Sequence, residues 1–395
     1  MSGVDIAVIG GGIHGAGVAQ AAAAAGYSVA LIEKGGIASG TSSKSSKLIH
    51  GGLRYLRQGH IGLVRESLRE REILLRIAPH LVHPADFLIP VHDDSRIRPW
   101  QLRLGLGLYA ALAGHNPLTA MAPLPPDSSL IPPSLARTAP RAVFHYRDAQ
   151  TDDRRLTLAV ALSARALGAR IFTHSQLVLG RRVTEGYDLS LRQAEGFRSL
   201  RCRVLVNAAG PWVNGVAASL VPEAPTLPVA LVKGSHLVLE QALGECCFYL
   251  ESPADGRALF ALPWQGGTLL GTTEEPFEGD PDRVEVSASE EAYLLGVLAR
   301  YFPHIAPRVV ARMAGLRVLP TGDNSPFQRS REVRFVERFS DGGGYLAILG
   351  GKLTGYRATA FKVMARLETV LGRRQPRADT ARLMLPEVEP SPRGW

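Results

Sequence analysis

The sequence contains little cysteine, with three residues in 395. Cys246 and Cys247 are adjacent and Cys202 stands alone, which fits neither a disulfide framework nor the ligand spacing of a zinc site. A secretory signal and a membrane span are also not expected. Residues 7–32 carry no Lys, Arg, Asp or Glu, yet their clustered glycines favour a strand, turn, helix and strand over a hydrophobic helix. We therefore expect a cytoplasmic protein with no metal site.

Length and positive charge are the features that the chain does have. A single hydrophobic core stops growing near ~250–300 residues, so 395 residues predict two domains. The 45 Lys and Arg residues outnumber 36 Asp and Glu, and the formal charge of +9 favours an anionic partner. The sequence contains no RNP-like or helix-turn-helix pattern, so nucleic acid is not expected. Phosphorylated metabolites and acidic lipid remain as partners.

A glycine-rich motif near the N-terminus predicts dinucleotide binding. Residues 5–32 indicate a βαβ unit, and Gly10, Gly12 and Gly15 occupy its first turn with the spacing GxGxxG. The first glycine of this motif permits the tight turn, the second lets the backbone approach a pyrophosphate, and the third allows close packing of helix and strand. The helix N-terminus then offers N–H groups to the phosphates. Glu33 ends the second strand, where an acidic side chain can bind ribose hydroxyls.

The residues after this unit favour FAD over a nicotinamide dinucleotide. A nicotinamide enzyme usually completes its sheet with a second mononucleotide half, whereas here the hydroxyl-rich loop 41–47 follows directly. A late apolar strand at Gly344–Leu349, the segment 350–354 and a long helix supply a second helix N-terminus. The dipole of that helix would stabilise the anion of a reduced flavin ring.

The rest of the chain alternates helices and strands around a proline-rich break. Apolar periodicity and capping residues predict helices at 62–78, 153–167, 288–302 and 354–371, and strands at 169–173, 201–208, 235–240, 258–263 and 268–272. Residues 115–141 contain seven prolines and indicate a loop. Asp152 and Asp153 are interpreted as a helix cap. The tail beyond Gly372 is rich in Pro and Arg and is expected to be poorly ordered.

Several blocks of sequence follow the order typical of one flavoprotein family. They are GTSSKSSKLIHGGLRYL at 40–56, DD at 152–153, VNAAGPW at 206–212, VKGSH at 232–236, FALPW at 260–264, GTT at 271–273, AGLR at 314–317 and GGKLT at 350–354. The first block is far more specific than the dinucleotide motif. With these blocks the sequence resembles the FAD-dependent glycerol-3-phosphate dehydrogenases of the aerobic type, within the D-amino-acid-oxidase-like flavoproteins.

The resemblance implies an α/β fold with two discontinuous domains. A Rossmann-like FAD-binding domain of the glutathione-reductase-2 type would comprise residues 1–90, 145–225 and 315–371. A mostly antiparallel β substrate domain would comprise 91–144 and 226–314, followed by a tail at 372–395. The matching blocks imply a cofactor site made of Gly10, Gly12, Gly15, Glu33, Thr41, Ser42, Ser46, Lys47, Leu48, Gly210, Gly351, Lys352, Leu353 and Thr354.

The resemblance also implies a reaction. This is the oxidation of sn-glycerol 3-phosphate to dihydroxyacetone phosphate, with hydride transfer to flavin N5 and electrons passed to quinone or another acceptor. A phosphate substrate requires fixed cations, and the planar fork of arginine suits this task. By this resemblance Arg317 is the first candidate for the phosphate and Arg331 the second. Arg54 and Tyr55 would close the site from the block at 40–56, which we call the flavin loop.

The substrate alcohol must lose its proton as the hydride leaves, so a base is needed near the hydroxyl. Histidine titrates near the operating pH and is the usual candidate. His236 and His50 both qualify, and the sequence does not decide between them or exclude a structural role for either. Lys352 is expected to hydrogen-bond the substrate oxygen or the flavin. Thr354 either donates to the flavin or caps the last helix.

Departures from the family pattern leave the substrate open. Arg317 is followed by Val-Leu-Pro instead of Pro-Leu, and Gly355 replaces a usual threonine. Family members commonly continue into a C-terminal helical domain, whereas this sequence stops at Trp395, so its oligomeric state is left open. The alternative function is a flavin oxidase or dehydrogenase of an amino acid or a 2-hydroxy acid, which shares the architecture. A flavin-binding membrane module without activity is a further alternative.

One segment suggests contact with a membrane. Residues 41–103 contain 11 basic and 6 acidic side chains, and they end in a run of arginines around Trp100. The short apolar run Leu104–Leu112 follows and cannot span a bilayer. This pattern is typical of an interfacial segment on the inner face of the cytoplasmic membrane, near a membrane quinone and anionic lipid. A helix buried under the β domain fits the same residues equally well.

Overall fold

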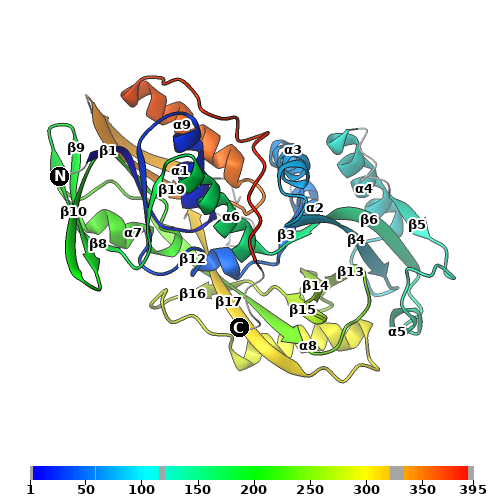
Figure 1. The fold of residues 1–395 in the computed structure, drawn as a ribbon. Coiled ribbons are helices and arrows are strands. Elements are labelled where there is room, and N and C mark those ends of the chain that lie inside the picture. The colour runs from blue at the N-terminus through cyan, green and yellow to red at the C-terminus, as the bar shows by residue number, and fades with distance from the viewer. Residues whose placement is uncertain (1–2, 58, 115–120, 321–332, 341, 390–395) are drawn as a thin grey trace.

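The computed structural model describes residues 3–57, 59–114, 121–320, 333–340 and 342–389. Two large β-sheets lie next to each other, and helices cover their faces (Figure 1). One sheet has a parallel core and the other is mostly antiparallel. This architecture confirms the predicted fold class.

The first sheet carries the dinucleotide motif. Its strands in spatial order are β11 (Leu220–Val221), β8 (Gln176–Val183), β9 (Gly186–Gln193), β10 (Gly196–Asn207), β1 (Gly3–Ile9), β2 (Val29–Ile32) and β7 (Arg170–Phe172), with β19 (Gly343–Leu349) on β10 and β18 (Arg334–Ser340) on β19. Strands β19, β10, β1, β2 and β7 run parallel to one another. Their carboxyl ends therefore meet at one edge of the sheet, where ligands of α/β folds bind.

The second sheet is antiparallel except for the pair β13–β4 among its described pairings. Its strands in spatial order are β16 (Glu275–Phe277), β12 (Val229–Leu239), β15 (Gly267–Gly271), β14 (Ala258–Trp264), β13 (Cys247–Glu251), β4 (Val82–Val91), β6 (Ala142–Thr151) and β3 (Leu48–Ile49), with β17 (Val309–Pro320) on β12 and β5 (Ala122–Leu124) on β6. The predicted strands at 235–240, 258–263 and 268–272 are confirmed within β12, β14 and β15. The sequence did not locate the other strands of this sheet, which are β3, β4, β5, β6, β13, β16 and β17.

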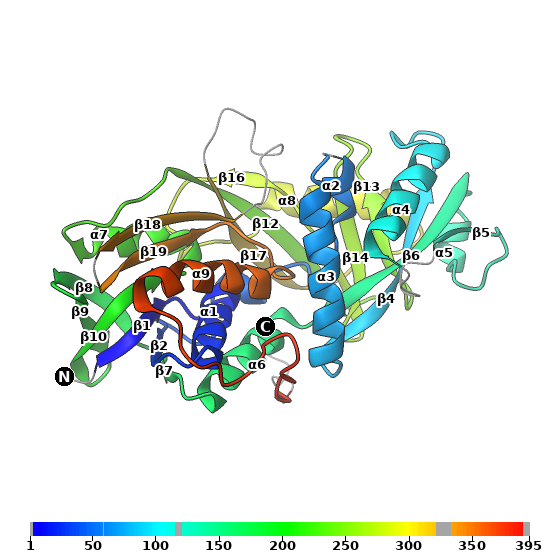
Figure 2. The same cartoon turned by 90° about the horizontal axis from the view of Figure 1, so that it is seen from above.

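Helices fill the space around both sheets. They are α1 (Ile13–Ala24), α6 (Asp153–Ala166), α7 (Val213–Ala218) and α9 (Tyr356–Leu371) on the first sheet, and α2 (Leu53–Arg57), α3 (Ile61–Ile77), α4 (Pro99–Ala113), α5 (Pro133–Ala136) and α8 (Ala288–Tyr301) on or near the second. In Figure 2, α3 lies between the helices of the first sheet and α4. The predicted helices at 62–78, 153–167, 288–302 and 354–371 are confirmed within two residues at each end, which is the usual uncertainty of helix boundaries. Among the described residues, no helix is both long and apolar enough to cross a bilayer.

Burial on all sides explains why residues 7–32 lack charge. Helix α1 packs against the first sheet and against α6 and α9 (Figure 1), and residues around its whole circumference are buried. A charged side chain on any face of α1 would lose its hydration without gaining a partner. At Gly17, a Cβ atom would lie 2.6 Å from the ring of Tyr356, so α1 and α9 meet where this helix has no side chain.

Sheet membership bears on the predicted domain limits, which stay a prediction. The limits at 90/91, 144/145 and 314/315 would cut β4, β6 and β17, although each of these strands belongs wholly to the second sheet. A hydrogen-bonded strand cannot be divided between two sheets without breaking its ladder. We propose that the limits move to the loops that flank these three strands, with both domains still discontinuous.

The expectation of a poorly ordered tail is wrong for residues 373–389. Leu385 is buried against α3, where its N–H donates to the carbonyl of Ile77 (2.8 Å). Further along, the guanidinium of Arg155 on α6 donates to the carbonyl of Val388 (2.5 Å). Burial of Leu385 and these two hydrogen bonds to backbone carbonyls therefore anchor the segment along α3 and α6.

Candidate functional site

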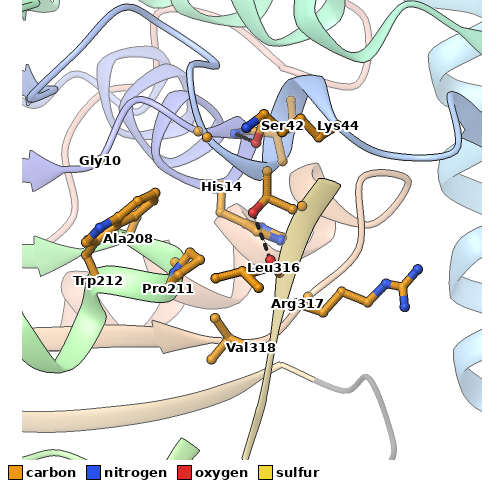
Figure 3. A pocket seen from close by; sticks show the side chains of 18 of the residues that line it. Gly10, His14, Ser42, Lys44, Ala208, Pro211, Trp212, Leu316, Arg317 and Val318 are labelled. Carbon is orange, nitrogen blue, oxygen red and sulfur yellow. Dashed lines mark hydrogen bonds between the residues drawn. The ribbon is translucent and has the colours of Figure 1, made fainter. Parts of the chain in front are cut away.

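A cavity of about 870 Å³ lies between the two sheets at the carboxyl ends of the parallel strands (Figure 3). It is lined by residues at the ends of these strands. Ile9 is the last residue of β1, while Glu33, Ala208 and Gly350 directly follow β2, β10 and β19. Its volume falls within the range of ~300–1,000 Å³ that is usual for cofactor sites. Strands β12 and β17 of the second sheet close the opposite wall.

The glycine-rich turn has the geometry that the motif predicts. Gly10 adopts a φ of 110°, and a Cβ atom there would lie 2.5 Å from the carbonyl oxygen of Ala208. A Cβ atom on Gly15 would lie 1.9 Å from the carbonyl oxygen of Gly10. Side chains at either position would therefore push the turn away from the sheet. Gly10 and Gly12 line the cavity, while Gly15 serves the packing beneath it.

Glu33 and Ser42 brace the turn from the cavity side. The Glu33 carboxylate accepts hydrogen bonds from the N–H groups of Gly11 (2.6 Å) and Gly35 (2.7 Å). The Ser42 hydroxyl accepts from the N–H of Ile13 (2.9 Å), the first residue of α1. Both side chains also line the cavity. The ribose contact of Glu33 stays a prediction.

Most of the other expected cofactor residues also line this cavity. They are Thr41, Ser46, Leu48, Gly210, Gly351, Lys352, Leu353 and Thr354. The hydroxyl of Thr41 donates to the carbonyl of Leu316 on β17 (2.8 Å), which links the flavin loop to the second sheet (Figure 3). The flavin loop therefore forms one wall of the cavity and a bridge between the two sheets.

Lys47 is placed differently from the prediction. Its side chain is buried outside the cavity lining, where Nζ forms an ion pair with Asp153 and donates to the carbonyl of Ser43 (2.6 Å). A buried ammonium group requires such a partner, and its ion pair with Asp153 keeps Nζ out of the cavity lining. Lys44 lines the cavity in its place. Of the two aspartates interpreted as a cap, Asp152 caps α6 through the N–H of Arg155 (3.0 Å), whereas Asp153 serves Lys47.

All four expected catalytic side chains, His236, His50, Lys352 and Arg317, share the cavity with the glycine-rich turn. His236 on β12 is buried, and its Nε2 atom lies 2.9 Å from the hydroxyl of Ser46. Burial lowers the pKa of His236 from 6.5 to about 3, and the positive charges of Arg317 and Lys47 act in the same direction. Its imidazole is therefore neutral over the working range of an enzyme. His50 lies at the same cavity, with its ring edge-on to Phe260 at 6.2 Å between centroids.

Lys352 and Tyr55 meet at the cavity wall. The Nζ atom of Lys352 lies 3.5 Å from the centroid of the Tyr55 ring, a cation–π contact. The Thr354 hydroxyl accepts a hydrogen bond from the N–H of His50 (3.2 Å) and does not cap α9, which begins at Tyr356. The loop before α9 therefore holds a fixed positive charge and supports the flavin loop.

Arg317 extends from β17 on the side opposite Leu316 and Val318 (Figure 3). Its guanidinium donates to the Thr272 hydroxyl (3.0 Å) and forms an ion pair with Glu274 (3.3 Å). These contacts fix the fork of the arginine at the cavity. Of the other predicted arginines, Arg331 lies outside the described residues. The backbone of Arg54 lies in α2, and its side chain falls outside the part of the structure that is described.

Sequence reasoning missed His14 on the first turn of α1. His14 lines the cavity, and burial lowers its pKa from 6.5 to about 4. The His14 ring packs closely on Gly351, since a Cβ atom on Gly351 would lie 2.2 Å from His14 Nε2. Its place inside the GxGxxG spacing, next to the turn that holds the pyrophosphate, was the available signal.

The residues present fit FAD. Gly10 and Gly12 line the cavity at the N-terminus of α1, where backbone N–H groups can bind a pyrophosphate. Three buried ring nitrogens at the cavity, His14 Nδ1, His236 Nδ1 and Trp212 Nε1, have no hydrogen-bond partner among the described residues. Buried polar atoms normally have partners, and a bound dinucleotide with its many oxygen and nitrogen atoms can supply them.

Comparisons with known proteins agree with this geometry. The family model "FAD dependent oxidoreductase" matches residues 5–357. The chain is 39% identical to a glycerol-3-phosphate dehydrogenase of Pseudomonas aeruginosa over 98% of its own length and 75% of the relative's length. It is 37% identical to a D-erythritol 1-phosphate dehydrogenase of Brucella abortus, over 93% of this chain and 74% of that protein.

A solved structure extends the similarity to three dimensions. The glycerol-3-phosphate dehydrogenase of Bacillus halodurans, determined in complex with FAD, superimposes with a TM-score of 0.76 at 27% identity. The match covers 97% of this chain and 68% of that one. The arrangement of two sheets around the cavity is therefore shared with a flavoprotein.

Proposed function

The chain belongs to the family of FAD-dependent oxidoreductases, and we propose that it oxidises sn-glycerol 3-phosphate to dihydroxyacetone phosphate. The observation that carries the proposal is the shared cavity of Arg317, His236, His50 and Lys352 with the glycine-rich turn. A phosphorylated alcohol needs a cation for its phosphate, an acceptor for its hydroxyl proton and a positive charge near the developing anion. These four side chains can supply all three.

Each side chain has a distinct role in this proposal. Arg317, already held by Thr272 and Glu274, binds the phosphate through its planar fork. His236 has a ring nitrogen, Nδ1, without a hydrogen-bond partner among the described residues, and this atom would accept the hydroxyl proton. Lys352 stabilises negative charge at the reacting end of the cavity. FAD, when bound, accepts the hydride that leaves the substrate carbon.

The residues that would hold the cofactor follow from the lining of the cavity. The turn at Gly10 and Gly12 would receive the pyrophosphate, and Glu33 the ribose of the adenosine. His50 and Tyr55 on the flavin loop and Gly351 before α9 would enclose the ring system. The Tyr55 side chain is buried, and Lys352 lies over its ring at that end of the cavity.

The direct test is anaerobic reduction of the bound flavin. The purified protein should be yellow and should lose its visible absorption when sn-glycerol 3-phosphate is added without oxygen. The panel should include D-erythritol 1-phosphate, since the Brucella relative carries that name. Faster reduction by the erythritol phosphate would change the substrate but keep the phosphate role of Arg317. Reduction only by an amino acid or a 2-hydroxy acid would contradict the proposal.

We further propose that the protein passes its electrons to a membrane quinone and contacts the inner face of the cytoplasmic membrane through α4. One side of α4 is buried through Leu102, Leu106 and Tyr109. The other side exposes Trp100 (63%) and Leu104 (66%), and Leu108 follows one turn later. The sequence left open whether this segment is interfacial or buried. Helix α4 combines both alternatives, because one side is buried in the protein and the opposite side exposes apolar residues.

The charge beside this stripe supports an anionic lipid surface. Arg98 and Arg103 are exposed next to Trp100, and an interfacial helix binds through apolar area together with attraction to anionic headgroups. Flotation with phosphatidylglycerol vesicles tests this idea. Trp100→Ser combined with Leu104→Ser should abolish flotation, while Phe197→Ser, which removes an exposed aromatic ring on β10, should leave it unchanged. Equal flotation of both variants would contradict a role for α4.

A further inference from the structure

A buried polar network connects α4 to the flavin loop. The hydroxyl of Tyr109 on α4 donates to the Asp148 carboxylate (2.7 Å), and Arg71 on α3 donates to the other oxygen of that carboxylate (2.7 Å). The same hydroxyl accepts a hydrogen bond from the N–H of Gly51 (2.9 Å). Tyr109, Asp148 and Arg71 are each at most 1% exposed. None of the three is among the residues that line the cofactor cavity.

The network ends beside a residue of the proposed site. Gly51 directly follows His50, and the N–H groups of these two residues donate to two different hydroxyls. The N–H of His50 donates to Thr354 (3.2 Å) and that of Gly51 to Tyr109 (2.9 Å). Two consecutive peptide groups are thus held from opposite sides, one by the loop before α9 and one by α4. This double attachment determines where His50 stands at the cavity.

The backbone of Gly51 packs tightly against Tyr109 and Leu68. A Cβ atom on Gly51 would lie 2.5 Å from the Tyr109 hydroxyl oxygen and 2.6 Å from Leu68 Cδ2. The Tyr109 hydroxyl is fixed in turn, because the buried Arg71–Asp148 pair holds its acceptor. A buried network in which each member has its partners holds a unique geometry. The network therefore restrains the flavin loop through the hydrogen bond from the N–H of Gly51 to the Tyr109 hydroxyl.

We propose that Tyr109 is a positioning residue of this enzyme, which acts through Gly51 to hold His50 and the flavin loop at the reacting end of the cavity. The expected effect on the rate of flavin reduction rests on the proposed function. The structural part of the proposal, the restraint of residues 48–53, stands apart from the identity of the substrate. A misplacement of about 1 Å in a reacting group can lower a rate on the order of a hundredfold, so a lost restraint should be visible in kcat.

The test compares Tyr109→Phe with Tyr301→Phe in the FAD-loaded protein. Tyr301 is a matched control, because its buried hydroxyl donates to the carbonyl of Glu251 (2.8 Å) and accepts from the N–H of the same residue (3.1 Å), outside the cavity lining. Both variants should lower Tm. Tyr109→Phe should in addition speed amide hydrogen exchange in the peptide spanning 48–53 about tenfold and lower the rate of anaerobic flavin reduction about tenfold or more, with a smaller change in KM. Tyr301→Phe should change neither.

A second variant covers the case in which Tyr109→Phe does not fold. Gly51→Ala keeps every hydrogen-bonding group of the network and displaces the flavin loop through its methyl group, so it should show the same faster exchange and slower reduction. Wild-type exchange and wild-type rates in a folded Tyr109→Phe or Gly51→Ala variant would overturn the proposal. If no phosphorylated alcohol reduces the wild-type flavin, the proposed function fails, but the exchange experiment still decides the role of Tyr109.

Discussion

The hydroxyl of Ser46 lies 2.9 Å from Nε2 of His236, although the two residues are 190 positions apart in the chain. Ser46 belongs to the flavin loop and His236 to β12 of the second sheet. Their contact joins the two walls of the cavity and fixes the orientation of the imidazole. The buried Nδ1 atom of the same ring has no hydrogen-bond partner among the described residues, and a bound ligand can supply one.

Removing the Ser46 hydroxyl should therefore weaken catalysis. In Ser46→Ala the imidazole of His236 loses its orienting partner, and we expect kcat to fall about tenfold with little change in KM. Ser43→Ala is the control, since Ser43 belongs to the same loop but bonds its hydroxyl to the carbonyl of Gly40 (3.2 Å). Steady-state kinetics with an artificial acceptor measure both. Equal kcat values in the two variants would contradict the orienting role.

Arg317→Ala should act mainly on phosphorylated substrate. Losing the phosphate contact should raise KM for sn-glycerol 3-phosphate on the order of a hundredfold, because a charge-assisted bidentate contact is removed from the ground state and the transition state alike. Arg312→Ala, on the same strand but exposed and paired with Glu291 (2.6 Å), should leave KM unchanged. Unphosphorylated glycerol at high concentration provides the second measurement. An equal loss with glycerol would show that Arg317 does not recognise the phosphate.

Lys352→Met should slow reduction of the flavin. The change keeps the length of the side chain over Tyr55 and removes its positive charge, so we expect a more negative flavin reduction potential and a rate lower by roughly a hundredfold. Lys362→Met on α9 removes an exposed lysine that pairs with Glu66 (2.6 Å) and should have no effect. Spectroelectrochemical titration gives the potential independently of turnover. An unchanged flavin reduction potential in Lys352→Met would show that the Lys352 ammonium group does not act on the flavin ring.

Gly15→Ala should abolish FAD binding. The new methyl carbon would lie 1.9 Å from the carbonyl oxygen of Gly10 and would force the turn open. The purified variant should be colourless, and its flavin content after acid release should be close to zero. Gly62→Ala, which adds a methyl group to open space on α3, should retain FAD. Full flavin content in Gly15→Ala would mean that the turn can move without loss of its ligand.

The stability of flavin-free protein should fall with acid below pH 6.5. Burial lowers the pKa of His14 from 6.5 to about 4, so as the pH falls through this interval the unfolded chain takes up a proton that the native state does not. The contribution of neutral His14 to the free energy of unfolding is therefore present above pH 6.5 and is lost toward pH 4. The pKa of His236 is also lowered, so its contribution is lost with acid in the same way. Urea unfolding at several pH values measures the slope. His14→Asn should flatten it, and an unchanged slope would show that His14 is protonated in the native state.

The local patterns of the chain determined much of the fold. GxGxxG between two apolar runs places a βαβ unit, because only glycine fits the close approaches of Gly10 and Gly15, and that requirement is visible in the sequence. Helix periodicity located α3, α6, α8 and α9, since each has one apolar side and recognisable ends. Strands such as β4, β6 and β17 were missed because a short or mixed apolar run does not by itself distinguish a strand from other structure.

Tertiary structure decided which side chains face the cavity. Lys44 and Lys47 lie in one hydroxyl-rich loop, and nothing in that loop reveals that Asp153 would take Lys47 into the interior. Likewise, the sequence places Tyr109 on an apolar helix, whereas its contact with Gly51 depends on how α4 packs. The sequence by itself determined the cofactor family through contacts between near neighbours. The direction of individual charges and hydroxyls depends on partners 50 to 200 residues away, and only packing brings those partners together.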